Sequence, residues 1–144
     1  MQDIDAVYTW VNGADRDFAE SRRRCLMDQG GCMAYEASGM HRFRDNEELR
    51  YSLRSLQAYA PWIHRIHIVT NGQFPRWLDC ENKRMRIVTH DKLFSNLKDL
   101  PTFNSNAIEI QIHKIPGLSD RFLYLNDDCF FGRPTSQSDF ITPA

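Results

Sequence analysis

The chain has 144 residues, of which 42% are hydrophobic and 26% are charged, and these proportions exclude collagen, coiled-coil, low-complexity and disordered chains. Its 18 lysines and arginines almost cancel its 19 aspartates and glutamates, so nucleic acid and anionic membrane surfaces are not favoured as partners. No apolar run approaches the roughly 18–20 residues of a membrane span, and the first residues lack the features of a secretory signal. We therefore expect a small or neutral ligand, and the oligomeric state stays open.

The four cysteines, at positions 25, 32, 80 and 129, contain no CxxC pair, so a zinc site is not expected. Cys25 and Cys32 would form a local disulfide in an oxidising compartment and would stay reduced in a cytoplasm. The sequence favours neither state and therefore assigns no compartment.

Four short apolar runs have the character of strands that are buried on both faces of a sheet. In chain order they are Ile4–Val11, Ile66–Thr70, Met85–Thr89 and Phe122–Leu125. Polar turn residues follow each run, namely Asn12-Gly13, Asn71-Gly72, His90-Asp91 and Asn126-Asp127-Asp128. Residues 14 to 44 form a charged stretch, expected to be helical in part, in which Arg22-Arg23-Arg24 is interpreted as a solvated helix face rather than a phosphate site.

A helix is predicted between the first two strands, because its start, stripe and stop signals agree. Asp45 is a plausible N-cap with Glu48 three residues later, and Pro61 ends the helix. One face carries the apolar stripe Leu49, Leu53, Leu56 and Ala60, and the other carries Arg50, Arg54 and Gln57.

A second helix is expected from about Asn106 to Ile115, with Pro116-Gly117 as its stop. Three isoleucines would face inward, Ile108, Ile112 and Ile115, which places Glu109 and His113 one turn apart on another face.

The alternation of strands and helices predicts a parallel α/β sheet, in which ligands bind outside the carboxyl ends of the strands. The last residues close with neither a helix nor a strand, so we expect that the chain is cut from a longer one.

Asn126-Asp127-Asp128 is the sharpest chemical signal, because a strand that ends in two adjacent carboxylates holds them at the mouth of the sheet. Mg²⁺ and Mn²⁺ are commonly bound by one or two carboxylates together with the phosphates of a substrate. We therefore predict that Asp127 and Asp128 bind a divalent cation. The alternative is an Asx turn that simply follows the strand.

Glu109 has two interpretations, because the spacing from Asn106 to Glu109 is that of a capping box, in which the carboxylate holds the start of a helix. The other interpretation is a site residue. His113 could relay a proton, but a lone helical histidine is more often a surface or core residue.

Arginines around the start and the polar face of the first clear helix suit a pyrophosphate, although exposed arginines are common on helices. They are Arg42, Arg44, Arg50 and Arg54. Trp10 stands near the end of the first strand, where it belongs either to the core or to a ligand pocket. The common dinucleotide, P-loop, serine-hydrolase and zinc-protease motifs are absent, which leaves a metal-and-phosphate site on an α/β sheet.

The segment Ile4-Asp5-Ala6-Val7-Tyr8-Thr9-Trp10-Val11-Asn12-Gly13 resembles the first conserved region of the Stealth family of sugar-phosphate transferases. Several segments resemble its second conserved region, among them Arg42-Phe43-Arg44-Asp45-Asn46-Glu47-Glu48-Leu49-Arg50, Leu100-Pro101-Thr102-Phe103-Asn104-Ser105-Asn106-Ala107-Ile108-Glu109 and Phe122-Leu123-Tyr124-Leu125-Asn126-Asp127-Asp128. The resemblance divides a single partial catalytic domain, residues 1–144, into the first region (1–13), a variable spacer (14–41) and the second region (42–140).

This resemblance implies a mostly parallel, Rossmann-like sheet of the nucleotide-sugar-transferase type, flanked by helices, as the N-terminal half of a larger catalytic domain. It implies that a sugar 1-phosphate, such as N-acetylglucosamine 1-phosphate, passes from a UDP-sugar to a hydroxyl of a glycan or polysaccharide acceptor, which leaves a phosphodiester and UMP. The family's later conserved regions, with a catalytic histidine and arginine, have no match here. The alternatives are therefore a truncated or non-catalytic nucleotide-sugar-binding module, and an ordinary glycosyltransferase that releases UDP. The location would be the cytoplasm for a bacterial member and the Golgi lumen for a eukaryotic one.

The resemblance also implies roles for two carboxylates. Glu109 and Asp128 correspond to active-site residues of the family, which act with a divalent cation, Mg²⁺ or Mn²⁺, held near Asp127 and Asp128.

The positions of four other residues suggest supporting roles in donor binding. Asn46 and Arg54 would lie near the phosphates, and Trp10 and Asn12 would border the nucleotide pocket.

Overall fold

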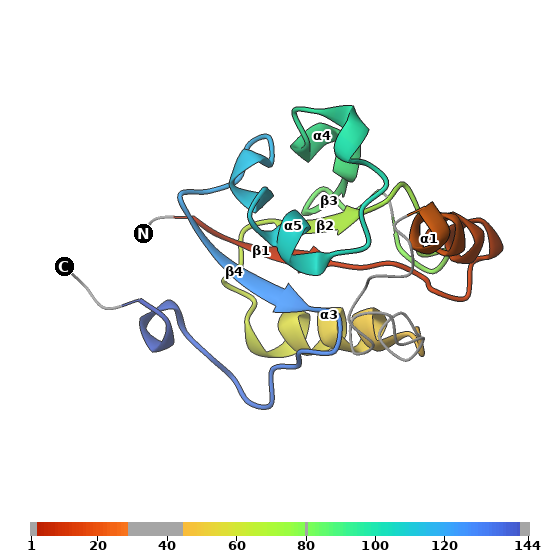
Figure 1. Ribbon diagram of the computed structural model, residues 1–144. Coiled ribbons are helices and arrows are strands. Elements are labelled where there is room, and N and C mark those ends of the chain that lie inside the picture. The colour runs from red at the N-terminus through yellow and green to blue at the C-terminus, as the bar shows by residue number, and fades with distance from the viewer. Residues whose placement is uncertain (1–2, 29–44, 80, 142–144) are drawn as a thin grey trace.

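The computed structural model describes residues 3–28, 45–79 and 81–141. Its strands form one parallel sheet in the order β3-β2-β1-β4 (Figure 1). They are β1 (Ile4–Thr9), β2 (Ile66–Thr70), β3 (Met85–Thr89) and β4 (Arg121–Asn126). All four predicted strands are therefore confirmed, and so is the α/β class with a parallel sheet flanked by helices.

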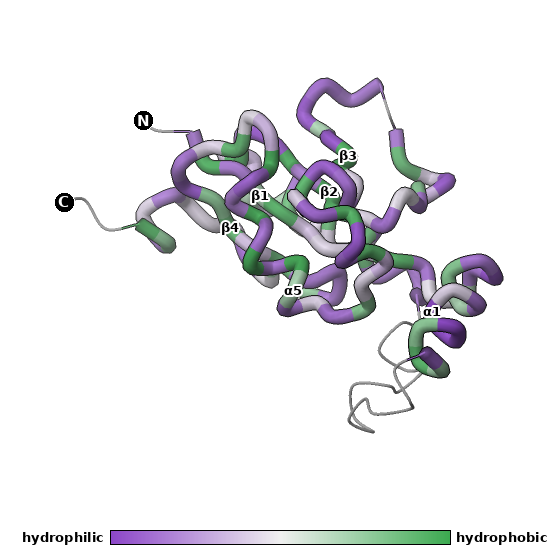
Figure 2. The backbone as a smooth tube through the Cα atoms, turned by 45° about the horizontal axis from the view of Figure 1, so that its top comes forward, coloured by the Kyte–Doolittle hydropathy of each residue, from purple (hydrophilic) through white to green (hydrophobic). Residues whose placement is uncertain are grey.

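Helices cover the two faces of the sheet, and the core is divided accordingly. The elements are α1 (Arg16–Asp28), α3 (Glu48–Tyr59), α4 (His90–Leu93), η2 (Leu97–Asp99), α5 (Ser105–Glu109), η3 (Ile112–Lys114) and η4 (Gln137–Asp139). Because successive strand residues point to opposite faces, Ala6 and Tyr8 pack on the side of α3, whereas Val7 packs with Leu93 and Ile108 on the side of α4 and α5. The residues of β1 and β2 are largely hydrophobic, and those of the outer loops are largely hydrophilic (Figure 2).

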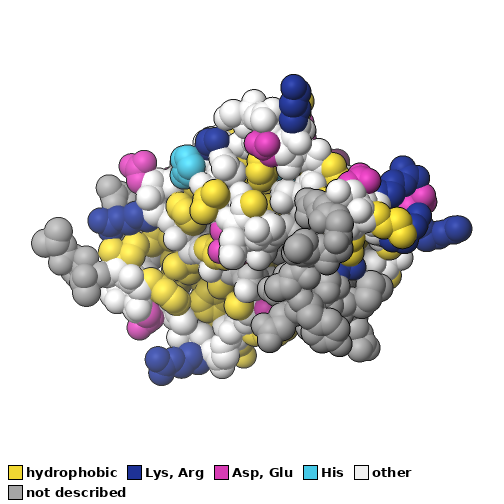
Figure 3. Space-filling model, viewed as in Figure 1, with side chains coloured by type: hydrophobic (Ala, Val, Ile, Leu, Met, Phe, Trp, Pro, Cys, Tyr) yellow, Lys and Arg dark blue, Asp and Glu magenta, His cyan; other side chains and the backbone are white. Residues whose placement is uncertain are grey.

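The prediction that every strand is buried on both faces holds for the central strands and is wrong for the edge strands. All of β2 is buried, and in β1 only Thr9 is partly exposed. Ile87 of β3 and Phe122 of β4 are each 36% exposed, because an edge strand lacks a neighbour on one side. Apolar side chains accordingly gather on the surface over β4 (Figure 3).

The first predicted helix is confirmed as α3, but its N-cap is not Asp45. Glu47 is the N-cap and has a left-handed backbone, with φ 64°. The Oδ1 atom of Asp45 accepts a hydrogen bond of 2.8 Å from the backbone N–H of Glu47, so Asp45 closes the turn before the helix. Leu49 and Leu56 are buried as expected, and Ser52 is buried between them.

The second predicted helix is not continuous. α5 ends at Glu109, and η3 follows after a short turn in which the backbone N–H of Gln111 bonds to the carbonyl of Ile108 at 2.9 Å. The β-branched isoleucines lower the helix propensity of this stretch, and after α5 the backbone closes tighter turns with hydrogen bonds between residues three positions apart. Ile108, Ile112 and Ile115 are buried, which confirms the inward face.

Smaller expectations had mixed outcomes. Arg22 is only 7% exposed, so the interpretation of the arginine triplet as a solvated face is wrong for its first member. His90 begins α4 directly after β3 instead of forming a turn. Cys32, Arg42 and Arg44 lie outside the described residues, so both alternatives for Cys25 and Cys32, a disulfide and two thiols, stay open. Among the described residues, none of the helices combines the length and the apolar character that crossing a bilayer requires.

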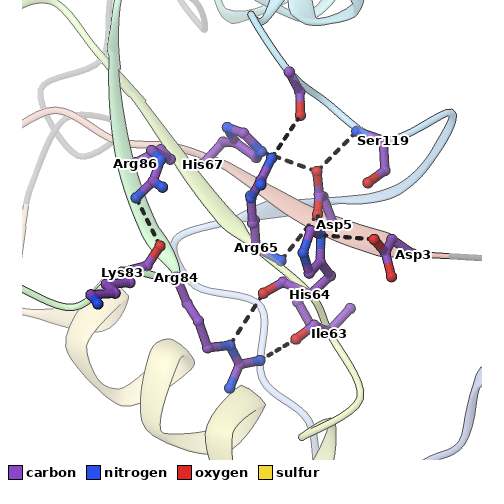
Figure 4. Close-up of polar contacts among 11 residues, drawn as sticks. Asp3, Asp5, Ile63, His64, Arg65, His67, Lys83, Arg84, Arg86 and Ser119 are labelled. Carbon is purple, nitrogen blue, oxygen red and sulfur yellow. Dashed lines mark hydrogen bonds and ion pairs between the residues drawn. The ribbon is translucent and has the colours of Figure 1, made fainter.

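The buried carboxylate of Asp5 stabilises the amino-terminal end of the sheet, which lies opposite the end where the ligand site is expected. Asp5 is fully buried and accepts hydrogen bonds from the ring nitrogens of His64 (3.2 Å) and His67 (3.1 Å) and from the backbone N–H groups of Arg65 (3.0 Å) and Ser119 (2.9 Å) (Figure 4). Burial alone would raise the pKa of Asp5, but these hydrogen bonds hold it below its usual 3.8. The network joins β1 to the segments that lead into β2 and β4.

His90 gives the fold a pH dependence that can be measured. Burial lowers the pKa of His90 from 6.5 to about 4, and the side chain is 6% exposed. Because the pKa in the folded state lies below the pKa in the unfolded state, the stability that His90 contributes is full above pH 6.5 and is lost as the pH falls toward 4. Between pH 7 and pH 4.5 this loss is about 2–3 kcal/mol.

We expect urea unfolding at these two pH values to show a smaller pH-dependent loss of stability for His90→Gln than for the wild type. An equal loss in both proteins would contradict the assignment of this pH dependence to His90.

Candidate functional site

The order of the strands identifies the ligand-binding end of the sheet. From β1 the chain continues to β2 and β3 on one side and then crosses to β4 on the other side of β1. The connection that leaves β1 crosses one face of the sheet through α3, and the connection that enters β4 crosses the other face through α4 and α5. The boundary between β1 and β4 is therefore a switch point, and open parallel sheets bind ligands at such a point, at the carboxyl ends of the strands. Thr9 and Asn126, the last residues of the two strands, are paired in register.

A turn follows β4 at this switch point and contains both predicted metal ligands. The backbone N–H of Cys129 donates to the carbonyl of Asn126 at 3.0 Å, so Asp127 and Asp128 occupy the centre of the turn. Asp127 is half-buried and Asp128 is exposed. Since this closing hydrogen bond is between backbone groups, the turn does not need an aspartate side chain to close it, which weakens the alternative of an Asx turn.

Negative charge accumulates around this turn. Burial raises the pKa of Asp127 to about 6, and the charges of Asp128, Glu48 and Asp45 act in the same direction. Among the described residues, no three side chains from histidine, cysteine, aspartate and glutamate are arranged to hold a metal ion. Two carboxylates are nevertheless a typical protein contribution to a Mg²⁺ site that is completed by phosphates, so this pair of oxygen donors fits a hard divalent cation shared with a ligand.

Two serines of α3 hold the turn of residues 126–129, called the acidic turn below, in place. The Oγ of Ser52 is 2.9 Å from the hydroxyl of Tyr8 and donates to the carbonyl of Cys129. The Oγ of Ser55 accepts a hydrogen bond of 2.9 Å from the backbone N–H of Phe131. Sequence analysis missed this role, although a serine in line with the apolar stripe at Leu49 and Leu56 was the available signal.

Ser52→Ala is expected to lower the free energy of unfolding by about 1–3 kcal/mol, because the hydroxyl of Tyr8 and the carbonyl of Cys129 lose a buried partner. Urea denaturation measures this change, with Gln57→Ala on the exposed face of α3 as the control, for which we expect less than about 0.5 kcal/mol. A Ser52→Ala protein as stable as the control would show that the turn is held by other contacts.

Glu109 approaches the switch point from the other face of the sheet. The hydroxyl of Tyr124 lies 3.1 Å from the Oε1 of Glu109, 3.0 Å from the Oγ1 of Thr9 and 3.1 Å from the Oδ1 of Asn126. The capping interpretation of Glu109 is wrong, because Glu109 is the last residue of α5 and the N-cap is Asn104, whose side chain accepts a hydrogen bond from the helix start.

The phenol of Tyr124 is affected by carboxylates on two elements, Glu109 of α5 and Asp127 of the turn after β4. Burial raises the pKa of Tyr124 to about 12, and the charges of Glu109 and Asp127 act in the same direction. The phenol therefore lies within the electrostatic range of carboxylates from both faces of the sheet. Glu109 contacts Tyr124 near the end of β4, and Asp127 follows the last residue of that strand, so both carboxylates lie at the same end of the sheet.

Two of the four residues predicted to bind the donor lie near the acidic turn or on neighbouring loops. The backbone N–H of Asn12 donates to the side-chain oxygen of Gln73 at 2.7 Å, and the Gln73 amide donates to the carbonyl of Asn12 at 3.0 Å, which joins the loops after β1 and β2. The side-chain amide of Asn46 donates to Glu48 at 2.6 Å, and Glu48 is one of the carboxylates whose charge reaches Asp127.

The other two residues have different surroundings. Trp10 is 6% exposed and packs in the core beside α3, and its indole N–H has no hydrogen-bond partner in the described part of the chain. Arg54 is exposed on α3, with its guanidinium 5.7 Å from the centre of the Tyr51 ring. His113 is exposed on η3.

The fold and the site define an α/β protein with an acidic site at the switch point of a parallel sheet. The chain matches the family model "Stealth protein CR1, conserved region 1" over residues 2–29 and the model "Stealth protein CR2, conserved region 2" over residues 42–144. The chain belongs to the Stealth family. The conserved regions expected from the sequence lie within these matches, apart from residue 1.

Curated relatives carry the names of phosphotransferases. The exopolysaccharide phosphotransferase SCO2592 of Streptomyces coelicolor is 49% identical over 142 residues, which are 97% of this chain and 15% of that protein. The exopolysaccharide phosphotransferase CpsY of Mycobacterium tuberculosis is 46% identical over 141 residues, 98% of this chain and 26% of that protein. The human N-acetylglucosamine-1-phosphotransferase subunits alpha/beta are 60% identical over 101 residues, 70% of this chain and 8% of that protein. The chain thus spans 8–26% of the length of these relatives.

Proposed function

We propose that the protein transfers a sugar 1-phosphate, such as N-acetylglucosamine 1-phosphate, from a UDP-sugar to a hydroxyl of a glycan acceptor. The products are a phosphodiester and UMP. The observation that carries this proposal is the placement of Glu109, Asp127 and Asp128 around one switch point, in a chain whose named relatives are phosphotransferases.

Asp127 and Asp128 would hold a divalent cation, Mg²⁺ or Mn²⁺, which when bound offsets the negative charge of the pyrophosphate and of the leaving nucleotide. The raised pKa of Asp127 is consistent with this role, because burial and then the neighbouring charge of Asp128 disfavour an ionised Asp127, and a bound cation would offset both. The turn after β4, which Ser52 and Ser55 of α3 hold, would keep both carboxylates at the ligand without a conformational change.

Glu109 would accept the proton of the acceptor hydroxyl. The acceptor oxygen then forms a bond to the β-phosphorus, while the bond between that phosphorus and the bridging oxygen breaks. The electron pair of the broken bond leaves with UMP. The half-buried position of Glu109 next to the phenol of Tyr124 supports this role, because both are at the end of the sheet where the phosphates would lie.

Four further residues would bind the donor. Asn12 and Trp10 would border the nucleotide, Asn12 from the loop after β1 and Trp10 from the buried position at the start of that loop. Asn46 and Arg54 would lie toward the phosphates, Asn46 through its place before α3 and Arg54 through its exposed guanidinium.

The nucleotide released by the full-length protein tests the proposal. We expect UMP when a UDP-sugar, Mn²⁺ and a glycan acceptor are incubated with the protein and the nucleotides are separated by chromatography. UDP in place of UMP would indicate an ordinary glycosyltransferase. If no nucleotide is released but calorimetry detects binding of the UDP-sugar, the protein is a binding module and the proposal is wrong.

A further inference from the structure

The hydroxyl of Tyr124 has three polar neighbours but only one proton to donate. Thr9, Glu109 and Asn126 each place a side-chain oxygen 3.0–3.1 Å from it. A phenol donates one hydrogen bond and accepts others, so the three contacts cannot all be donations from Tyr124. The chemistry of the partners therefore decides where the proton lies.

An ionised carboxylate is a stronger acceptor than an amide or hydroxyl oxygen. The phenol proton of Tyr124 thus points to the Oε1 of Glu109 while Glu109 is ionised. Thr9 has a hydroxyl that can rotate, so it can donate its own proton to the oxygen of Tyr124. The direction of donation runs from Thr9 to Tyr124 to Glu109.

We propose that Tyr124 is a positioning residue that holds the carboxylate of Glu109 in the orientation needed to accept the proton of the acceptor hydroxyl. This inference rests on the proposed function. Glu109 is the last residue of α5, a helix of five residues, and its side chain needs a fixed partner to keep one orientation. β4 supplies this partner, because its register with β1 places Tyr124 opposite Val7 and near Thr9.

The same geometry serves both protonation states of Glu109. When Glu109 has accepted the proton, its carboxyl group becomes a donor and no longer needs the phenol proton. The hydroxyl of Tyr124 can then turn to the Oδ1 of Asn126, which is also 3.1 Å away. No proton is transferred in this rotation, and the carboxyl group of Glu109 can donate its new proton to the oxygen of Tyr124.

The other tyrosine of the sheet, Tyr8, is fully buried and has a different role. Tyr8 lies on the opposite face, and its hydroxyl contacts Ser52, which holds the acidic turn. Tyr124 is thus the tyrosine that contacts a proposed catalytic carboxylate in the described part of the chain. Its hydroxyl, not its ring, carries the inference, so phenylalanine is the informative substitution.

The test uses steady-state kinetics of the full-length protein with four variants: Tyr124→Phe, Glu109→Gln, the double variant and Tyr59→Phe. We expect Tyr124→Phe to lower kcat by about 10- to 100-fold, the range for a hydrogen bond to a charged group, with the KM for the UDP-sugar within about twofold. Tyr59→Phe, a half-buried tyrosine at the end of α3, serves as the control and should stay within about twofold in both constants.

Non-additivity separates positioning of Glu109 from a general structural effect. If Tyr124 acts through Glu109, adding Tyr124→Phe to Glu109→Gln should change kcat by less than about twofold. If Tyr124→Phe lowers kcat by the same factor in the wild type and in the Glu109→Gln protein, the inference is overturned. A Tyr124→Phe protein with the kcat of the wild type would also overturn it. Failure of the proposed function looks different, because Glu109→Gln would then retain turnover or the released nucleotide would be UDP.

A second variant keeps the test informative if Tyr124→Phe does not fold. Thr9→Val removes the donor to Tyr124 with little change of shape, and we expect about a 2- to 10-fold lower kcat that disappears in the Glu109→Gln background. A Thr9→Val protein with the kcat of the wild type would overturn the inference. Thr9→Ser keeps the hydroxyl, so its kcat should be close to that of the wild type.

Discussion

Asp128→Asn is expected to lower turnover by about a thousandfold or more, with a free energy of unfolding within about 0.5 kcal/mol of the wild type. Asp128 is exposed at the centre of a turn that a backbone hydrogen bond closes, so the fold does not depend on its charge. The proposed reaction does depend on it, because asparagine is a weaker metal ligand than aspartate. Turnover at saturating Mn²⁺ and urea unfolding measure the two quantities.

Asp120→Asn is the matched control for this variant, since Asp120 is exposed just before the opposite end of the same strand. We expect this control to keep the activity and the stability of the wild type. If Asp128→Asn unfolds the protein, or if it keeps more than about a tenth of the turnover, Asp128 does not have the proposed role.

Asp127→Asn is expected to make the protein more stable at pH 7.5 in metal-free buffer, although it should remove the activity. The pKa of Asp127 is raised from 3.8 to about 6, mainly by burial and then by Asp128. A carboxyl group whose pKa is higher in the folded state destabilises that state as the pH rises from 3.8 to 6, and the penalty is full above pH 6. The full shift corresponds to about 3 kcal/mol, and solvent screening of this half-buried group reduces the expected gain to about 1–2 kcal/mol.

Urea unfolding at pH 7.5 and pH 4 with a chelator measures this gain. The gain should shrink at pH 4, where the folded wild type already carries a protonated Asp127. Addition of Mn²⁺ should stabilise the wild type and not the variant, because a ligand that binds only the folded state raises its stability. A less stable Asp127→Asn protein at pH 7.5 would mean that the carboxylate has a structural role in the turn.

Short-range signals account for the parts of the fold that the sequence predicted. The four strands are apolar runs bounded by polar residues, and α3 combines an apolar stripe with a proline after its end. The wrong parts depend on long-range pairing or on the start of a helix. The exposure of β3 and β4 follows from their places at the sheet edges, which no local pattern encodes, and the N-cap of α3 follows from the left-handed backbone of Glu47.

The candidate site was predictable only in its carboxylates. Asp127 and Asp128 follow a strand directly, and strand ends are where parallel sheets bind ligands. The contact between Thr9 and Tyr124 joins residues 115 positions apart, and the contact between Ser52 and Cys129 joins residues 77 positions apart. Such contacts depend on the strand order and on the position of α3, so the residues that support the carboxylates became visible only in the structure.

The position of the labelled phosphorus after one reaction tests the central claim most directly. A UDP-sugar that carries a radioactive β-phosphorus is incubated with the full-length protein, a divalent cation and a glycan acceptor, and the products are separated. If the proposed function is right, the label appears in the phosphodiester on the acceptor, and the released UMP is unlabelled. Label in released UDP, with an unlabelled sugar on the acceptor, would contradict the transfer of a sugar 1-phosphate.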